Sequence, residues 1–424
     1  MKILGLAAMA CVLFGCPGGT PATDGGGGGS GGGTGGGAGG GDAGPVNLLP
    51  DDFQAAGSTV LIAADGGGVV VGQVSRPDSG TSIDLLVARF GGNLVRDPAF
   101  GTDGVAVADF DGGSLGGLIS LDNDFGSSAA FDGDKIITVG SARGEAAGGY
   151  DWALVRFTAS GQLDPTFGTG GTVLKPYGMQ NAGHLNNVAV IGGKYLVCGV
   201  VNGSAVLARY NADGTIDPAF TGAVTNFGTN ELCGTLLIQG TKALAAGRDF
   251  TIARYTDVGA VDTTFGTAGA YTTSGSLGGA HLRADGKIWL VGTKVVSSGG
   301  TDTSYLKQVL LSADGVPDTG FGTGGILETP LNLSQVRGAA MQGAKLVLYI
   351  PSVPARLIRI NADGSIDASF GTSGTIPVPF TLPLFDAPFD AHRHLTITGN
   401  TAWVTDLNLV GTRTRLGLFT TPLP

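Results

Sequence analysis

The sequence is dominated by a short motif that recurs six times. Its clearest copy is Leu207–Phe220, which reads LARYNADGTIDPAF: an apolar strand, a turn, an aspartate and a phenylalanine. The other copies are Val87–Phe100, Val155–Gly168, Ile252–Phe265, Leu310–Phe321 and Ile358–Phe370. The motif phenylalanines fall at positions 100, 167, 220, 265, 321 and 370, so that neighbouring copies are 45 to 67 residues apart. This period is longer and less regular than that of a tight solenoid, and it predicts similar units with loops of different lengths.

A second element, a turn followed by an apolar run, precedes most copies of the motif. In Asp132–Gly140 the turn is Asp-Gly, and in Gly192–Gly199 it is Gly-Gly. Both pairs are typical of tight hairpins, because their residues accept positive φ. The same element recurs at Asp65–Gly72, Gly240–Gly247 and Asp285–Gly292. With a short strand before it and a last strand after the Phe-Gly corner, each unit reads as four strands, which describes a propeller blade.

A seventh, eroded unit lies at the C-terminus. Leu395–Val404 resembles the first two strands of a unit and Arg415–Phe419 the third, and the sequence ends before a fourth. Val46–Leu49 resembles the missing fourth strand. We therefore predict an all-β, seven-bladed β-propeller with four-stranded blades, whose ring is closed by an N-terminal strand that completes the last blade. Such a strand would cover an exposed sheet edge, the usual liability of β proteins.

The motif resembles the delta-60 repeat family of bacterial β-propeller proteins. The Arg-Tyr-Asn-Ala-Asp-Gly-Thr-Ile-Asp-Pro-Ala-Phe pattern at Arg209–Phe220 carries the resemblance, which covers nearly all of Pro45–Pro424. The resemblance implies a propeller fold in an exported or surface protein. It implies no activity and no active site.

The N-terminus reads as an export signal rather than as part of the fold. Lys2 is followed by the apolar run Ile3–Phe14, which is too short to span a membrane comfortably, and then by Gly15 and Cys16. The segment resembles a bacterial lipoprotein signal, which implies cleavage before Cys16 and acylation of that cysteine. The alternative is an ordinary cleaved signal with an incidental cysteine.

A glycine-rich tract separates this signal from the repeats. Of the 17 residues in Gly25–Gly41, 14 are glycine, a composition that buries no apolar surface and predicts a disordered tether. We therefore expect three parts: a signal peptide (1–15), a lipidated cysteine with its linker (16–44) and the propeller (45–424). Pro17 after the cysteine is unlike an inner-membrane retention signal, which favours the outer membrane.

The charge balance excludes some classes of partner. With 34 acidic and 24 basic side chains, the formal net charge is -10, whereas nucleic-acid binding needs clustered Lys and Arg. Simple electrostatic adhesion to anionic lipid is disfavoured for the same reason. The expected membrane contact is therefore the lipid anchor alone.

The polar residues of the motif have a structural interpretation. We expect each motif aspartate to accept the amide two residues on in an Asx turn, and each phenylalanine to fill the gap between neighbouring blades. The motif arginine is a candidate partner for the aspartate, although Leu310 replaces it in the fifth unit. The motif aspartates are Asp97, Asp164, Asp217, Asp262, Asp318 and Asp367. We do not interpret them as ligands, because a residue present in every blade usually builds the blade.

Other candidate sites are weaker. The acidic clusters at Asp109–Gly112 and Asp122–Asp124 lack a full calcium loop with its terminal glutamate, so we predict no metal site and no cofactor. The histidines are His184, His281, His392 and His394. Of these, His281 and His394 fall on expected first strands, which line the central channel of a propeller. Cys198 and Cys233 lie in adjacent expected blades, either as a disulfide or as two buried thiols.

Three functions are compatible with this sequence. The first is an envelope-anchored binding, adhesion or scaffolding module whose protein or glycan ligand meets the long loops at 75–84, 142–151 and 297–304. The second is a propeller enzyme, such as a sugar lyase or a quinone-dependent dehydrogenase, which rests on analogy of fold alone. The third is a purely structural envelope component. Because the sequence shows no catalytic constellation, we expect a non-enzymatic binding module.

Overall fold

A computed structural model describes most of the repeat region. The chain divides into two units, Met1–Asp42 and Ala43–Pro424, and all described residues belong to the second unit. They are residues 46–47, 54–63, 66–75, 83–110, 125–143, 150–175, 184–201, 204–221, 224–225, 233–247, 249–331, 335–352, 354–379, 395–410 and 413–424. The expected signal peptide, Cys16 and the glycine-rich linker all lie outside the described residues. The described residues hold no helix that is long and apolar enough to cross a membrane.

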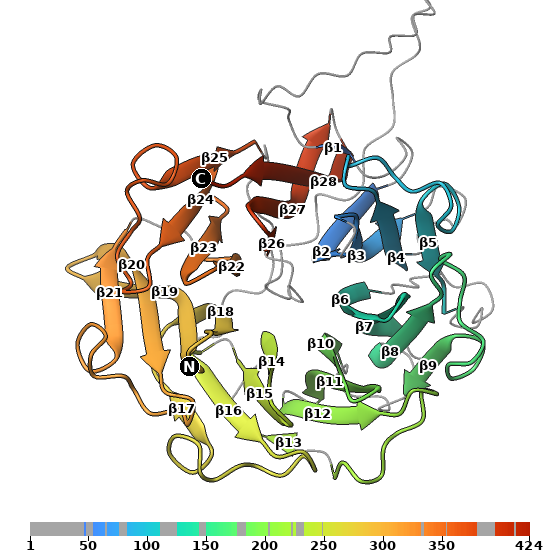
Figure 1. Cartoon of the computed structure of the whole chain (residues 1–424), viewed down its shortest axis with the longest axis horizontal. Helices are drawn as coiled ribbons and strands as arrows, with labels where there is room; N and C mark the ends of the chain where they lie inside the picture. Colours follow the sequence, from blue (N-terminus) through green and yellow to red (C-terminus); the bar gives the residue numbers. More distant parts are fainter. Residues whose placement is uncertain are drawn as a thin grey trace, which may run out of the picture. The chain divides into compact units, whose positions relative to one another are not determined.

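The described strands form seven four-stranded antiparallel sheets arranged around a common axis (Figure 1). Blade one contains β2 (Gln54–Ile62), β3 (Gly68–Ser75), β4 (Ile83–Phe90) and β5 (Val105–Ala108). Blade two contains β6 (Phe125–Asp132), β7 (Lys135–Arg143), β8 (Tyr150–Phe157) and β9 (Thr172–Lys175). Blade three contains β10 (His184–Ile191), β11 (Lys194–Val201), β12 (Ser204–Tyr210) and β13 (Val224–Thr225). Blade four contains β14 (Thr235–Gln239), β15 (Lys242–Ala246), β16 (Thr251–Tyr255) and β17 (Ala270–Thr272).

The remaining blades follow the same order from the axis outward. Blade five contains β18 (Ser276–Leu282), β19 (Ile288–Ser298), β20 (Thr301–Leu311) and β21 (Ile326–Pro330). Blade six contains β22 (Gly338–Gln342), β23 (Lys345–Ile350), β24 (Ala355–Ile360) and β25 (Thr375–Val378). Blade seven contains β26 (Leu395–Thr398), β27 (Thr401–Val410), β28 (Arg413–Pro422) and β1 (Val46–Asn47).

Blade seven confirms the predicted ring closure. β1 is its outermost strand, with Val46 opposite Leu418 and Asn47 opposite Gly417. The strand that follows the N-terminal unit therefore completes the sheet whose other three strands end the chain. This pairing covers the outer edge of β28, which the C-terminal strands alone would leave open.

The apolar core lies between the blades rather than in one central mass. The described residues form seven clusters of buried apolar side chains, and each cluster combines residues from two neighbouring blades. Phe100 of blade one, for example, packs with Ile136 and Phe157 of blade two. All six motif phenylalanines belong to such clusters and are at most 7% exposed, which confirms their predicted place between blades.

Candidate functional site

The turn of each motif forms around its aspartate. Asp164 Oδ1 accepts the backbone amide of Thr166 at 3.1 Å. The equivalent bond, two residues on, forms at each of the other five motif aspartates. The predicted Asx turn is therefore present in every copy, and it directs the chain from the third strand of the blade towards the fourth.

The second carboxylate oxygen of the motif aspartate binds two cations in four of the blades. Asp217 Oδ2 lies 2.6 Å from Arg209 Nε and 2.8 Å from Lys194 Nζ. The same grouping occurs at Asp164, Asp262 and Asp367. The bonds from Lys194 and Arg209 lower the pKa of Asp217 to about 2, which keeps this carboxylate charged at neutral pH. The sequence indicated the arginine partner but not the lysine, which comes from the second strand.

The motif arginine also joins neighbouring blades. Arg209 donates from Nη1 to the carbonyl oxygen of Asp257 in blade four at 2.6 Å. Its guanidinium carbon lies 4.9 Å from the centre of the Phe220 ring. One side chain thus contacts the aspartate and phenylalanine of its own motif and the turn of the next blade. These contacts favour the structural interpretation of the repeated carboxylates.

Blade five replaces the motif arginine with contacts from elsewhere. Leu310 occupies the arginine position, and Asp318 keeps the bond to Lys287, at 2.7 Å. Arg283, from the turn after β18, donates to the carbonyl oxygen of Ala362 in blade six at 3.0 Å. Gln308 adds a bond of 2.8 Å to the carbonyl oxygen of Gly364. The link between blades is therefore kept although the motif residue is lost.

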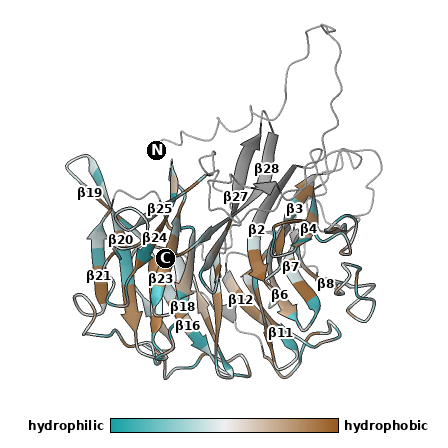
Figure 2. Ribbon diagram, turned by 45° about the horizontal axis from the view of Figure 1, so that its top comes forward, coloured by the Kyte–Doolittle hydropathy of each residue, from teal (hydrophilic) through white to brown (hydrophobic). Residues whose placement is uncertain are grey.

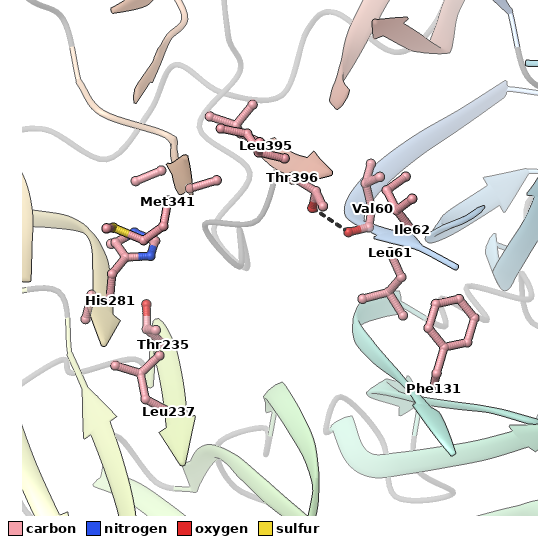
Figure 3. A pocket seen from close by; sticks show the side chains of 15 residues that line it. Val60, Leu61, Ile62, Phe131, Thr235, Leu237, His281, Met341, Leu395 and Thr396 are labelled. Atoms are coloured by element: carbon pink, nitrogen blue, oxygen red, sulfur yellow. Dashed lines mark hydrogen bonds between the residues drawn. The ribbon is translucent and has the colours of Figure 1, made fainter. Parts of the chain in front are cut away.

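A cavity of about 450 Å³ lies on the axis of the ring. The innermost strands of six blades line it: β2, β6, β14, β18, β22 and β26. Most of its lining side chains are apolar, and Figure 3 shows Leu61, Ile62 and Phe131 across the opening from Leu237 and Met341. This volume lies within the range of about 300–1,000 Å³ that is typical of small-molecule sites.

The histidines fall in different environments. His281 lines the axial cavity, as its predicted place on a first strand requires, whereas His392 and His394 lie outside the described residues. His184 is only 7% exposed, and its Nδ1 lies 2.6 Å from Ser141 Oγ. Burial lowers the pKa of His184 to about 4, so this imidazole is neutral at neutral pH.

The remaining candidate residues are placed as follows. Cys198 of β11 and Cys233, just before β14, are joined by a disulfide that links blades three and four. Asp109 is exposed after β5, while Asp111, Gly112 and Asp122–Asp124 lie outside the described residues. Within the described part of the chain, no three His, Cys, Asp or Glu side chains gather where they could hold a metal ion.

One hairpin projects beyond its blade. The pairing of β19 with β18 ends at Thr293, and the pairing of β20 with β21 ends at Tyr305. The segment Val295–Ser304 therefore continues as a two-stranded ribbon, closed by a turn in which Gly299 and Gly300 have φ of 59° and 81° (Figure 2). At the base of this ribbon, Val295 is 55% exposed and Val296 is 39% exposed.

One family model matches parts of the repeat region. Residues 134–167, 193–220 and 354–370 match a family model described as a domain of unknown function (DUF5122) beta-propeller. No curated protein sequence matches the chain. The matched residues include the motif copies of blades two, three and six.

Comparison with solved structures gives many matches of low sequence identity. BamB from Moraxella catarrhalis is 13% identical, with 88% of this chain and 93% of BamB covered at a TM-score of 0.41. The WD40 beta propeller domain of Doa1 is 12% identical, with 88% of this chain and 95% of the Doa1 chain covered at a TM-score of 0.47. The polysaccharide lyase Uly1 is 9% identical, with 86% of this chain and 89% of the Uly1 chain covered at a TM-score of 0.47. Likenesses of this size carry no argument about function. The chain is thus a seven-bladed β-propeller, with repeats similar to those of a propeller family whose function is unknown.

Proposed function

We propose that this protein is an envelope-anchored binding module that holds a partner protein on one face of its propeller. The observation that carries the proposal is the projecting ribbon Val295–Ser304. Among the described residues, no strand pairs with its edges beyond Thr293 on one side and beyond Ser304, which accepts the Leu331 amide, on the other. Two partly exposed valines, Val295 and Val296, lie at its base. An open two-stranded ribbon of this kind is suited to a partner that adds an extended strand.

The other long connections support the choice of this face. The segments 75–84 and 142–151 join β3 to β4 and β7 to β8, just as 297–304 joins β19 to β20. Strand direction alternates in an antiparallel blade, so all connections from second to third strands lie at the same face of the ring. The Asx turns of the motif lie at the opposite face. In this proposal the partner binds at the face with the long loops, and the Asx turns that join the blades lie at the other face.

Anchoring rests on the N-terminal sequence. Cys16 in its lipoprotein-like context would carry the acyl chains, and the glycine-rich tract before residue 45 would let the propeller adopt many orientations at the membrane. We place the anchor in the outer membrane, because Pro17 is unlike a retention signal. In a bacterial host, the full-length chain should incorporate a palmitate analogue, and a Cys16→Ala variant should not. Equal labelling of the two would rule out lipidation at Cys16.

Photo-crosslinking tests the binding face. A photoreactive residue placed at Val296 of the full-length chain should give a discrete protein adduct in intact envelopes. The matched control is Val261, a valine with 38% exposure against 39% for Val296, which follows a motif turn on the opposite face. The Val261 position should give no such adduct. The adduct at Val296 should disappear when Ser297→Pro disrupts the ribbon edge. Equal adducts from both positions, or none from Val296, would contradict the proposal.

A further inference from the structure

The axial cavity divides into apolar walls and one polar corner. Leu61, Ile62 and Phe131 form one wall, and Met341 stands opposite them (Figure 3). The corner is formed by Thr235 of blade four and His281 of blade five, which both line the cavity and are drawn on the same side of the opening in Figure 3. The hydroxyl of Thr396, also in the lining, donates to the carbonyl oxygen of Val60 at 2.8 Å and so joins blades seven and one.

The described lining residues are all uncharged or neutral in type. No Asp, Glu, Lys or Arg is among the described residues that surround the cavity. A charged ligand would lose its hydration there without gaining an ion pair, which is costly. The cavity therefore discriminates against ionic ligands and favours an uncharged molecule with a largely apolar surface.

The described residues that line the cavity belong to the innermost strands of the ring. Its walls are β-strands that are paired on their outer side, and their backbone positions are set by the packing of adjacent blades. Gly279 shows how closely the corner is built: a Cβ at this position would lie 3.1 Å from His281 Nε2 and 3.2 Å from Ala339 Cβ. A rigid site of this kind loses little conformational entropy on binding.

We propose that the axial cavity binds a small, uncharged, mainly apolar molecule through one hydrogen-bonding group that meets Thr235 and His281. This site is independent of the protein partner proposed above, because it lies on the axis and not on the projecting ribbon. The ligand class follows from the mainly apolar side chains of the described lining, from the absence of Asp, Glu, Lys and Arg among those residues, and from the polar groups of Thr235 and His281.

A pair of fluorescent probes tests the ligand class. The full-length chain carrying Cys16→Ser, which has no acyl chain to compete for the dye, is titrated with neutral N-phenylnaphthylamine and with anilinonaphthalene sulfonate. The two dyes share a ring skeleton and differ in one anionic group. The neutral dye should bind at one saturable site, with the sulfonate weaker by at least about tenfold. Equal affinity for the two dyes would overturn the proposal.

Filling the cavity tests the location. Ala340→Phe and Leu61→Trp, on different walls, should each abolish saturable binding of the neutral dye, whereas Val295→Phe on the projecting ribbon should not. A thermal melt establishes that each variant is folded. If Ala340→Phe does not fold, Leu61→Trp provides the test, and the reverse also holds. Unchanged binding in a folded wall variant would place the dye elsewhere and refute the site.

Competition tests the polar corner. Naphthol should displace the neutral dye at a lower concentration than naphthalene, by about fivefold for one net hydrogen bond. His281→Leu should remove most of this advantage without weakening naphthalene. If naphthol kept its full advantage in that variant, His281 would have no part in recognition.

Discussion

At the scale of single residues, the motif aspartate organises most of the polar chemistry described above. Its two oxygens have separate tasks, because one accepts the turn amide and the other binds cations from two strands. In blade four, Asp262 meets Arg254 at 2.8 Å and Lys242 at 2.7 Å, and Arg254 is only 4% exposed. In blade five, Asp318 meets Lys287 but no motif arginine, and Asp318 is 24% exposed against 7% for Asp262. Asp262 and Asp318 therefore allow a buried and a more exposed motif carboxylate to be compared within one protein.

Asp262→Asn should destabilise the fold more than Asp318→Asn. Asparagine retains a side-chain oxygen for the turn, so each substitution removes mainly the charge. Loss of that charge at Asp262 leaves Arg254 buried with a weakened set of partners, at a cost of about 3 kcal/mol. At Asp318 the more exposed pair, which is screened by water, should cost much less. Urea denaturation of both variants measures the difference in the free energy of unfolding. Similar losses would show that burial of the arginine is unimportant.

At the scale of elements, the contact between a motif phenylalanine and the next blade depends on a glycine. Gly315 has a φ of +77°, and a Cβ placed on it would lie 2.7 Å from the ring of Phe265 in the preceding blade. Gly161, Gly214, Gly259 and Gly364 stand in the same relation to the phenylalanine before them. The turn glycine therefore serves both the local backbone and the packing of two blades.

Gly315→Ala should cost more than Gly240→Ala. Gly240 also has positive φ, +64°, but nothing lies within 4 Å of its added Cβ. Both substitutions incur a left-handed backbone penalty of about 1–2 kcal/mol. Only Gly315→Ala adds overpacking against Phe265, at about 1–3 kcal/mol more. Thermal unfolding of the two variants separates these contributions, and equal melting temperatures would mean that the interface yields without strain.

At the scale of the whole molecule, the ring is closed by a very short strand, β1. β1 holds two residues, and so does β13, the outer strand of blade three. Their roles differ, because the blades next to β13 are continuous in sequence whereas β1 joins the start of the propeller to its end. Blade three is also linked to blade four by the Cys198–Cys233 disulfide.

Replacing Val46–Asn47 by Pro-Pro should therefore be more damaging than the same change at Val224–Thr225. Proline has no amide proton, so either change weakens an outer strand pairing. Opening of blade seven also frees the ends of the ring and exposes the β28 edge to other molecules. We expect a lower melting temperature, by about 2–4 °C for each kcal/mol lost, and self-association on size-exclusion chromatography. Equal behaviour of the two variants would argue against closure by β1.

Much of this organisation could be predicted from the sequence because it repeats. Six copies of one pattern identify the strands, the Asx turn and the phenylalanine between blades, and the incomplete seventh unit indicates the closing strand. A contact that occurs in only one blade leaves no repeated pattern in the sequence, and it could not be predicted in this way. The replacement of the motif arginine at Leu310 by Arg283 depends on two segments that meet only after blades five and six pack together.

The sequence by itself determined the blade, since each blade is specified by local alternation of apolar residues and by turn residues that accept positive φ. Only the tertiary structure decided what faces the axis. First strands β2, β6, β10 and β18 each contain a bulge, between Gly57 and Thr59 in β2 for example, and a bulge changes the alternation of faces along a strand. The apolar cavity and its polar corner at Thr235 and His281 depend on how the first strands of the blades, six of which line the cavity, meet around one axis.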